Sequence, residues 1–114
     1  MKKFKIATRD GCLAYVKASS HKLILKNGEK VDVIAHRPYK SNDSYWCVSE
    51  KETGFQIVGW KEYHSFICED YFRGLDTKER ALWTAVSKLN NYLCDKGKTF
   101  AEFKEKRLKE VNNV

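Results

Sequence analysis

The segment LILKNGEKVDV, residues 23–33, decides the fold, because it predicts both a tight turn and the register of the strands beside it. Asn-Gly between apolar stretches is the strongest short-range signal for a β-hairpin. A two-residue loop would pair Leu25 with Lys30 and mix apolar and charged side chains on each face. A three-residue loop, residues 26–28 with Gly28 left-handed, instead gathers Leu23, Leu25, Val31 and Val33 on one face. The register therefore favours the three-residue loop, with Lys22, Lys30 and Asp32 on the other face beside Ile24 and Ile34.

Two further hairpins are predicted, one before this segment and one after it. The earlier one pairs Lys3–Thr8 with Cys12–Ala18 around Arg9-Asp10-Gly11. The later one pairs Tyr45–Ser49 with Phe55–Trp60 around Glu50–Gly54. With Val48 opposite Ile57, the later hairpin would carry Trp46, Val48, Phe55 and Ile57 on one face. Gly59 would then lie opposite Trp46 and leave room for its indole.

The C-terminal part of the chain is predicted to be helical. Asp76 is followed three residues later by Glu79, which is the spacing of a helix N-cap, and Gly97 is a natural stop. Between them, apolar residues recur at helical spacing: Leu82, Ala85, Val86, Leu89 and Leu93. A second capping box, Thr99 to Glu102, predicts another helix to about Val111, with Phe100, Phe103, Leu108 and Val111 on its apolar face. Residues 37–43 read as a loop around Pro38, and residues 61–75 fit either a short helix or an extended strand.

These elements predict an α+β fold with an antiparallel β-sheet of about five or six strands built from hairpins, followed by two C-terminal α-helices. The 114 residues suit a single domain, mainly β over residues 1–60 and mainly α over residues 76–112. A hydrophobic content of 42% allows a packed core and disfavours wholesale disorder.

The chain is expected to be cytoplasmic. No apolar run approaches the roughly 20 residues that a membrane span needs, and the residues after Met-Lys-Lys do not form the apolar stretch of a signal peptide. Cys12, Cys47, Cys68 and Cys94 are widely spaced without a C-x-x-C motif. In a secreted chain they could form two disulfides, whereas without a signal peptide reduced thiols are favoured.

The net charge of the chain is confined to its first third. Residues 1–40 hold ten basic and three acidic residues, which gives +7, while residues 41–114 are balanced. A directed positive field attracts polyanions or acidic partners. We predict that a basic face of the N-terminal sheet binds nucleic acid or a nucleoprotein partner through Lys3, Lys5, Lys17, Lys22, Lys26, Lys30, Arg37, Tyr39, Lys40 and Tyr45. Tyr15, Tyr39 and Tyr45 are the aromatic groups that could stack on bases. The competing interpretation is a set of lysines that protects sheet edges from aggregation.

Other chemistry is less well supported by the sequence. His64 and Cys68 are spaced for one helical face, with Cys47 as a third metal-ligand type, but structural zinc needs a second close pair. Cys12 could be a nucleophile only if His21, His36 or His64 lay beside it. The acidic residues do not cluster as metal-dependent catalysis requires. We therefore predict no catalytic residue, no metal and no cofactor.

Trp83 lies about 100° from the centre of the apolar stripe of the first helix. A tryptophan there usually closes the rim of a core. The alternative is an exposed anchor for a partner, because tryptophan is enriched in binding hot spots.

Trp46-Cys47-Val48-Ser49-Glu50 and Thr53-Gly54, followed by Thr77-Lys78-Glu79-Arg80-Ala81, resemble a hairpin-and-helix pattern of small phage and prophage accessory proteins. The chain departs from that pattern by inserting residues 60–76 between hairpin and helix, and by having Arg80 where Glu is commoner. The resemblance implies a mobile-element origin and a non-enzymatic binding role, such as that of an anti-CRISPR inhibitor acting on a host nucleoprotein machine. It implies no catalytic residues.

The sequence leaves two alternative functions open. The order of hairpin and helix is similar to the end of a double-stranded-RNA-binding domain, although Thr77–Ala81 does not match that domain's lysine-rich helix start. The other is a small enzyme with a Cys/His site.

Overall fold

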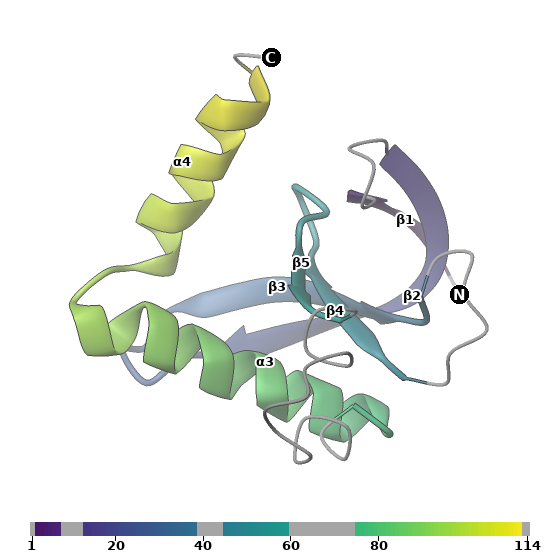
Figure 1. Ribbon diagram of the computed structural model, residues 1–114, viewed down its shortest axis with the longest axis horizontal. Coiled ribbons are helices and arrows are strands. Elements are labelled where there is room, and N and C mark those ends of the chain that lie inside the picture. The colour runs from purple at the N-terminus through teal and green to yellow at the C-terminus, as the bar shows by residue number, and fades with distance from the viewer. Residues whose placement is uncertain (1, 8–12, 39–44, 60–74, 113–114) are drawn as a thin grey trace.

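The computed structural model describes residues 2–7, 13–38, 45–59 and 75–112. It has an α+β fold, a five-stranded antiparallel sheet followed by two helices, as the sequence predicts (Figure 1). The strands lie in chain order: β1 (Lys2–Ala7), β2 (Leu13–Ile24), β3 (Lys30–His36), β4 (Cys47–Glu50) and β5 (Gln56–Val58). The helices are α3 (Lys78–Tyr92) and α4 (Phe100–Asn112), joined by the 3-10 turn η1 (Cys94–Lys96). The predicted turn at residues 9–11 and the ambiguous segment 61–75, apart from Leu75, lie outside the described residues.

The β2–β3 hairpin has the predicted register. Leu23 lies opposite Val31, and Gly28 is left-handed with φ +91°. The Leu25 N–H donates to the Glu29 carbonyl at 2.9 Å and closes the three-residue loop. The four apolar side chains of this face are all buried in the main core: Leu23, Leu25, Val31 and Val33. The prediction is confirmed because turn chemistry and apolar alternation demand the same register.

Strand β2 is longer than predicted. The sequence suggested two strands, ending at Ala18 and beginning again at Leu23, but β2 runs unbroken from Leu13 to Ile24. Residues 19–21 pair with β3 through Ser19 opposite Ala35 and His21 opposite Val33. The polar side chains in the middle of the strand therefore do not end the backbone ladder.

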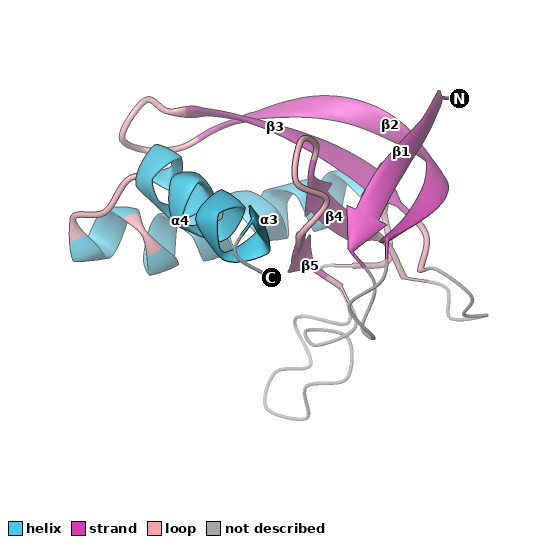
Figure 2. Cartoon of the chain, turned by 90° about the horizontal axis from the view of Figure 1, so that it is seen from above, coloured by secondary structure: helices cyan, strands magenta, loops and turns pink. Residues whose placement is uncertain are grey.

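The strong curvature of β2 explains why polar residues occupy the middle of the strand (Figures 1 and 2). Successive side chains of a strand point to opposite faces. In its first half β2 buries Ala14 and Ala18 in a small core with Ile6 and Ile34. In its second half it buries Leu23 in the main core, on the other face of the strand. Ile34, expected beside the charged residues, is fully buried because β1 and β2 curl over that face.

The β4–β5 hairpin departs from the predicted register at a bulge. Ser49 pairs with Gln56 as predicted, but Val48 lies opposite Val58 rather than Ile57. The irregularity buries both Ile57 and Val58. The predicted position of Gly59 opposite Trp46 is also wrong, because the bulge shifts the pairing by one residue. A side chain at Gly59 would meet Gln56.

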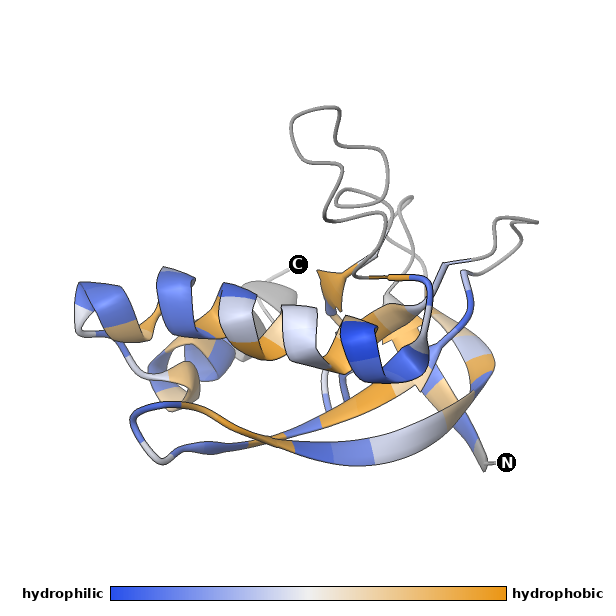
Figure 3. Ribbon diagram, turned by 90° about the horizontal axis from the view of Figure 1, so that it is seen from below, coloured by the Kyte–Doolittle hydropathy of each residue, from blue (hydrophilic) through white to orange (hydrophobic). Residues whose placement is uncertain are grey.

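Helix α3 covers the main core. Its N-cap is Thr77, whose hydroxyl accepts from the Arg80 N–H, while Asp76, the cap expected from the sequence, forms an ion pair with Arg80 at 3.5 Å. Apolar positions of α3 and of the neighbouring strands are coloured orange in Figure 3. The buried face is rotated slightly from the predicted stripe, since Ala81, Thr84, Ala85 and Leu89 are buried and Leu82 and Val86 only partly so. Trp83 is 71% exposed, so the prediction that it closes the core rim is wrong.

Helix α4 is capped by two groups that lie far apart in the sequence. The Thr99 hydroxyl accepts from the Glu102 N–H, as the capping box predicts. The Glu29 carboxylate, from the β2–β3 turn, accepts from the Phe100 and Ala101 N–H groups at 2.7 and 3.1 Å. Asn27 also donates to Glu29. The hairpin turn thus binds the start of α4.

Replacing Glu29 with Ala is expected to cost about 0.5–2 kcal/mol of stability, the usual range for a lost helix N-cap. Burial alone would raise the pKa of Glu29, but hydrogen bonds from Phe100, Asn27 and Ala101 outweigh it and hold the pKa below its ordinary value of 4.5. Stability from this group is complete above pH 4.5 and falls as the pH drops through 4.5 toward the lower pKa of the folded state. Urea unfolding at pH 7 and pH 3.5 should show a smaller difference between Glu29→Ala and wild type at the lower pH. An equal difference at both would contradict the charged cap.

Candidate nucleic-acid interface

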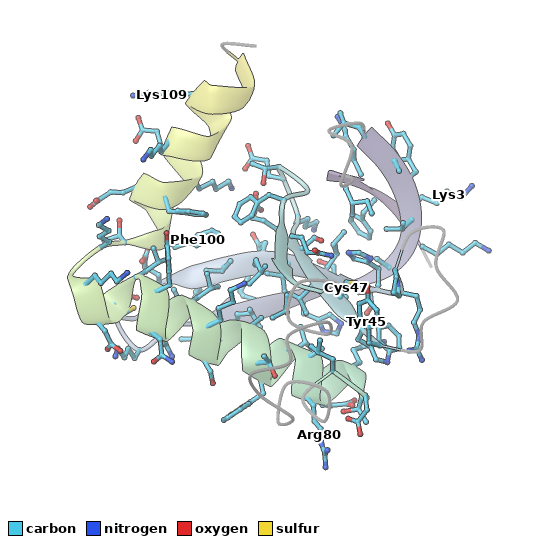
Figure 4. The ribbon with its side chains drawn as sticks, viewed as in Figure 1. Lys3, Tyr45, Cys47, Arg80, Phe100 and Lys109 are labelled. Carbon is cyan, nitrogen blue, oxygen red and sulfur yellow. The ribbon has the colours of Figure 1, made fainter. Side chains whose placement is uncertain are left out.

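The outer face of the β1–β2 hairpin presents three lysines around an exposed tyrosine. Lys3 lies opposite Lys17, and Lys5 lies opposite Tyr15. All four side chains are exposed, Tyr15 at 68%. Leu13, at 59% exposure, ends the row. Lys3 projects away from the body of the molecule (Figure 4). We call these five residues the basic hairpin face.

The curvature of β2 creates this face. Odd-numbered side chains of β2 share one side of the strand, which α3 covers at Leu23. At Leu13, Tyr15 and Lys17 the strand has curved away from α3, and the same side is open (Figure 1). Even-numbered side chains at this end fill the small core instead.

Among the described residues, no carboxylate neutralises the lysines of the basic hairpin face. No ion pair in the described part of the chain includes Lys3, Lys5 or Lys17. Two like charges directly opposite each other destabilise a strand pair by a few tenths to about 1 kcal/mol. The arrangement of Lys3 against Lys17 therefore costs stability.

The remaining predicted lysines do not join this face. Lys22 and Lys30 lie on the opposite side of the sheet, away from α3, and Lys22 lies 3.9 Å from Asp32. Lys26, in the turn, forms an ion pair with Asp95 and its backbone N–H donates to Asn90. The predicted single basic surface is thus divided, because Lys17 and Lys22 point to opposite faces of one strand.

The predicted residues after β3 are also dispersed. The Arg37 guanidinium stacks over Trp46, 4.2 Å from the ring centroid, and donates to the Tyr45 carbonyl at 3.4 Å. Tyr45 is 2% exposed and belongs to the main core, so its predicted role in stacking on a partner is wrong. Tyr39 and Lys40 lie outside the described residues.

Of the residues considered for catalysis or metal binding, His36 and Cys47 are buried, His21 is partly buried, and the others lie outside the described segments. His36 and Ser49 form a hydrogen bond of 2.8 Å, but both are almost fully buried. Burial lowers the pKa of His36, and a weaker hydrogen bond to the Arg37 carbonyl acts in the opposite direction. Burial, aided by the charge of Lys78, also lowers the pKa of His21. Cys12, His64 and Cys68 lie outside the described residues. Among the described residues, Cys47 is buried and Cys94 is partly buried.

Within the described segments, no three His, Cys, Asp or Glu side chains gather as a metal site would require. No described helix is long and apolar enough to cross a membrane.

The structure contains a second basic and aromatic cluster, which was not predicted from the sequence. Lys98 and Lys106 line a pocket with Tyr92 and Phe103 between the end of α3 and the start of α4. The net charge of residues 41–114 gives no sign of these lysines, because an equal number of acidic residues in that stretch balances the basic ones. The available signal was that Lys98, just before the predicted last helix, and Lys106, within it, lie on either side of Phe103 in the sequence.

Comparison of the chain with protein-family models, curated proteins and solved structures finds no match.

Proposed function

We propose that this protein is a binding module that attaches to single-stranded nucleic acid through the basic hairpin face. The observation that carries the proposal is the alignment of Lys3, Lys5 and Lys17 around the exposed ring of Tyr15. Single-strand binding commonly combines lysines that neutralise phosphates with aromatic rings on which bases stack. Both groups are present here on one open surface.

The loss of stability caused by placing Lys3 opposite Lys17 supports a role of these lysines in binding. Lysines that merely protect a sheet edge gain nothing from facing each other across two strands. Lys3 and Lys17 do face each other, without a carboxylate among the described ion pairs. A bound phosphate chain would relieve this repulsion and gain from the released counterions.

The test is a titration with a labelled single-stranded oligonucleotide at several salt concentrations. Three neutralised phosphates predict a slope of log affinity against log salt of about −2, from about −0.7 per phosphate on a single strand. Lys17→Glu should weaken binding by about tenfold or more. The same substitution should raise the midpoint of thermal unfolding, because it replaces a repulsive cross-strand pair with an attractive one.

Lys30→Glu is the matched control, since it makes the same change in net charge on the other side of the sheet. It should weaken binding far less than Lys17→Glu. Equal losses for the two variants would mean that net charge, not this face, governs binding. Binding that does not depend on salt would contradict the proposal.

A second candidate function is docking on a nucleoprotein machine through an acidic protein surface, as the resemblance to phage accessory proteins suggests. The exposed Leu13 beside Tyr15 favours it, because tyrosine is enriched among interface hot spots and the leucine extends the apolar surface that a protein partner can cover. Affinity purification from a host lysate, with and without nuclease, separates the two. A partner that survives nuclease and is lost in Leu13→Ser would favour protein docking.

A further inference from the structure

A pocket lies between the C-terminal end of α3 and the start of α4. Its apolar part is formed by Tyr92, Leu93 and Phe103. Its polar rim includes Lys98, Glu102 and Lys106. The pocket therefore combines aromatic surface with two cations, and none of these residues belongs to the basic hairpin face. Figure 4 shows Phe100, at the start of α4, on the other side of the molecule from Lys3.

The aromatic wall of the pocket, formed by Tyr92 and Phe103, is held in place by contacts within the protein. The Phe103 ring packs edge-on against Phe55 and against Tyr92, with centroids 5.3 and 6.3 Å apart. Phe100 lies 6.2 Å from Phe103 on the core side. Lys104, which follows Phe103 in α4, forms ion pairs with Glu50 and Glu52 of the β4–β5 hairpin. These contacts fix α4 against the body, so a ligand would not have to order the wall.

The pocket is positively charged and keeps an exposed aromatic ring. Tyr92 remains 54% exposed despite its contact with Phe103. The Lys96 ammonium lies 4.7 Å from the centroid of the Tyr92 ring and adds a third cation to Lys98 and Lys106. Glu102 is the one acid among the lining residues, so the local charge stays positive. The positive charge favours an anionic ligand, and the exposed ring of Tyr92 favours one that carries a planar ring.

The N-terminus of α4 is not the anion site. Its Phe100 and Ala101 N–H groups already donate to the Glu29 carboxylate. An anion in the pocket would have to rely on the lysine ammonium groups. The lysines and the aromatic surface, rather than the helix dipole, therefore define the chemistry of the pocket.

We propose that this pocket binds a nucleoside monophosphate, with the base stacked on Tyr92 and the phosphate held by Lys98 and Lys106. Glu102 would accept a hydrogen bond from an exocyclic amino group, so adenine is favoured over uracil. This site is separate from the basic hairpin face and does not depend on the proposed function.

The test uses AMP, UMP, adenosine and inorganic phosphate as probes in NMR titrations of the full chain. AMP should bind saturably and at least tenfold more tightly than inorganic phosphate or adenosine, since each lacks half of the recognised groups. UMP should bind more weakly than AMP, and Glu102→Gln should narrow that difference. Tyr92→Ala should weaken AMP binding by about tenfold, the effect of losing one stacking platform.

Lys98→Gln combined with Lys106→Gln should also weaken AMP binding by about tenfold. Lys109→Gln is the control for the loss of a lysine charge on α4: Lys109 lies on the same helix as Lys106, pairs with Glu105 and does not line the pocket. It should change the affinity less than twofold. AMP binding should persist when Lys3, Lys5 and Lys17 are all replaced by Gln, which separates this site from the basic hairpin face.

Three results would overturn the proposal. They are equal affinity for AMP and inorganic phosphate, equal losses in the double variant and in Lys109→Gln, and no saturable AMP binding at millimolar concentration. Retained thermal unfolding midpoints in the variants would show that lost binding does not reflect lost folding.

Discussion

Replacing Leu89 with Asp is expected to unfold the protein. Leu89 is buried on the face of α3 that covers the main core, among the buried side chains of β2 to β5. Removing a buried leucine costs about 2–5 kcal/mol, and the new carboxylate must also lose its hydration or leave the core. Small domains have only about 5–15 kcal/mol of total stability. Far-UV circular dichroism and urea unfolding of the variant should show the loss of the cooperative transition.

Asn91→Asp is the control for this prediction. Asn91 is exposed on the same helix, so the same charged group is introduced without burial. That variant should unfold within about 1 kcal/mol of the wild type, because an exposed anion in the last turn of a helix costs no more than that. A Leu89→Asp protein with an unchanged unfolding midpoint would contradict the packing of α3 on the sheet.

Replacing Glu50 with Ala is expected to cost about 2–4 kcal/mol, because a buried charge that organises a turn would be lost. Glu50 is 1% exposed, and its carboxylate accepts from the Glu52 and Thr53 N–H groups, both at 2.8 Å. It also lies 3.9 Å from the Lys104 ammonium of α4. In Glu50→Ala the N–H groups of Glu52 and Thr53 would lose their acceptor, and Lys104 would lose one of its two carboxylate partners. Leaving buried donors or charges without a partner is among the costlier changes to the stability of a protein. Thermal and urea unfolding measure the effect.

Glu52→Ala separates burial from charge in this cluster. Glu52 also pairs with Lys104, but its side chain is exposed. A hydrogen bond to Glu52, with the nearby charge of Glu50, raises the pKa of Lys104. As an exposed ion pair, the Glu52 contact should contribute at most about 1 kcal/mol. If Glu52→Ala were as destabilising as Glu50→Ala, the organising role of the buried carboxylate would be wrong.

Features that depend on neighbouring residues could be predicted from the sequence. The loop at residues 26–28 follows from Gly28 and from the apolar alternation beside it, and both survive folding unchanged. The Thr99 capping box and the left-handed Gly97 are equally local. The N-cap of α3 was predicted at Asp76 but is Thr77, one residue later. Both residue types are good N-caps, and the ion pair between Asp76 and Arg80 leaves Thr77 to cap the helix.

Features that depend on curvature could not be predicted. Lysines from both predicted hairpins were expected on one surface, but β2 joins the two hairpins as one strand and sends Lys17 and Lys22 to opposite faces. Tyr45 is in the core and Trp83 is exposed, the reverse of what each sequence position favoured. The exposure of Trp83 depends on which face α3 turns toward the sheet.

The sequence by itself determined the order of the elements, the register of the central hairpin and the starts of the two helices, since turn residues, caps and side-chain period act within a few positions of the chain. The tertiary structure alone decided which lysines share a surface and that Glu29 caps α4. It also decided that Lys98 and Lys106 meet Tyr92 in one pocket. These outcomes join groups as many as 72 positions apart in the chain. Their placement follows from the bend of β2 and the packing of α3 and α4, which no local pattern encodes.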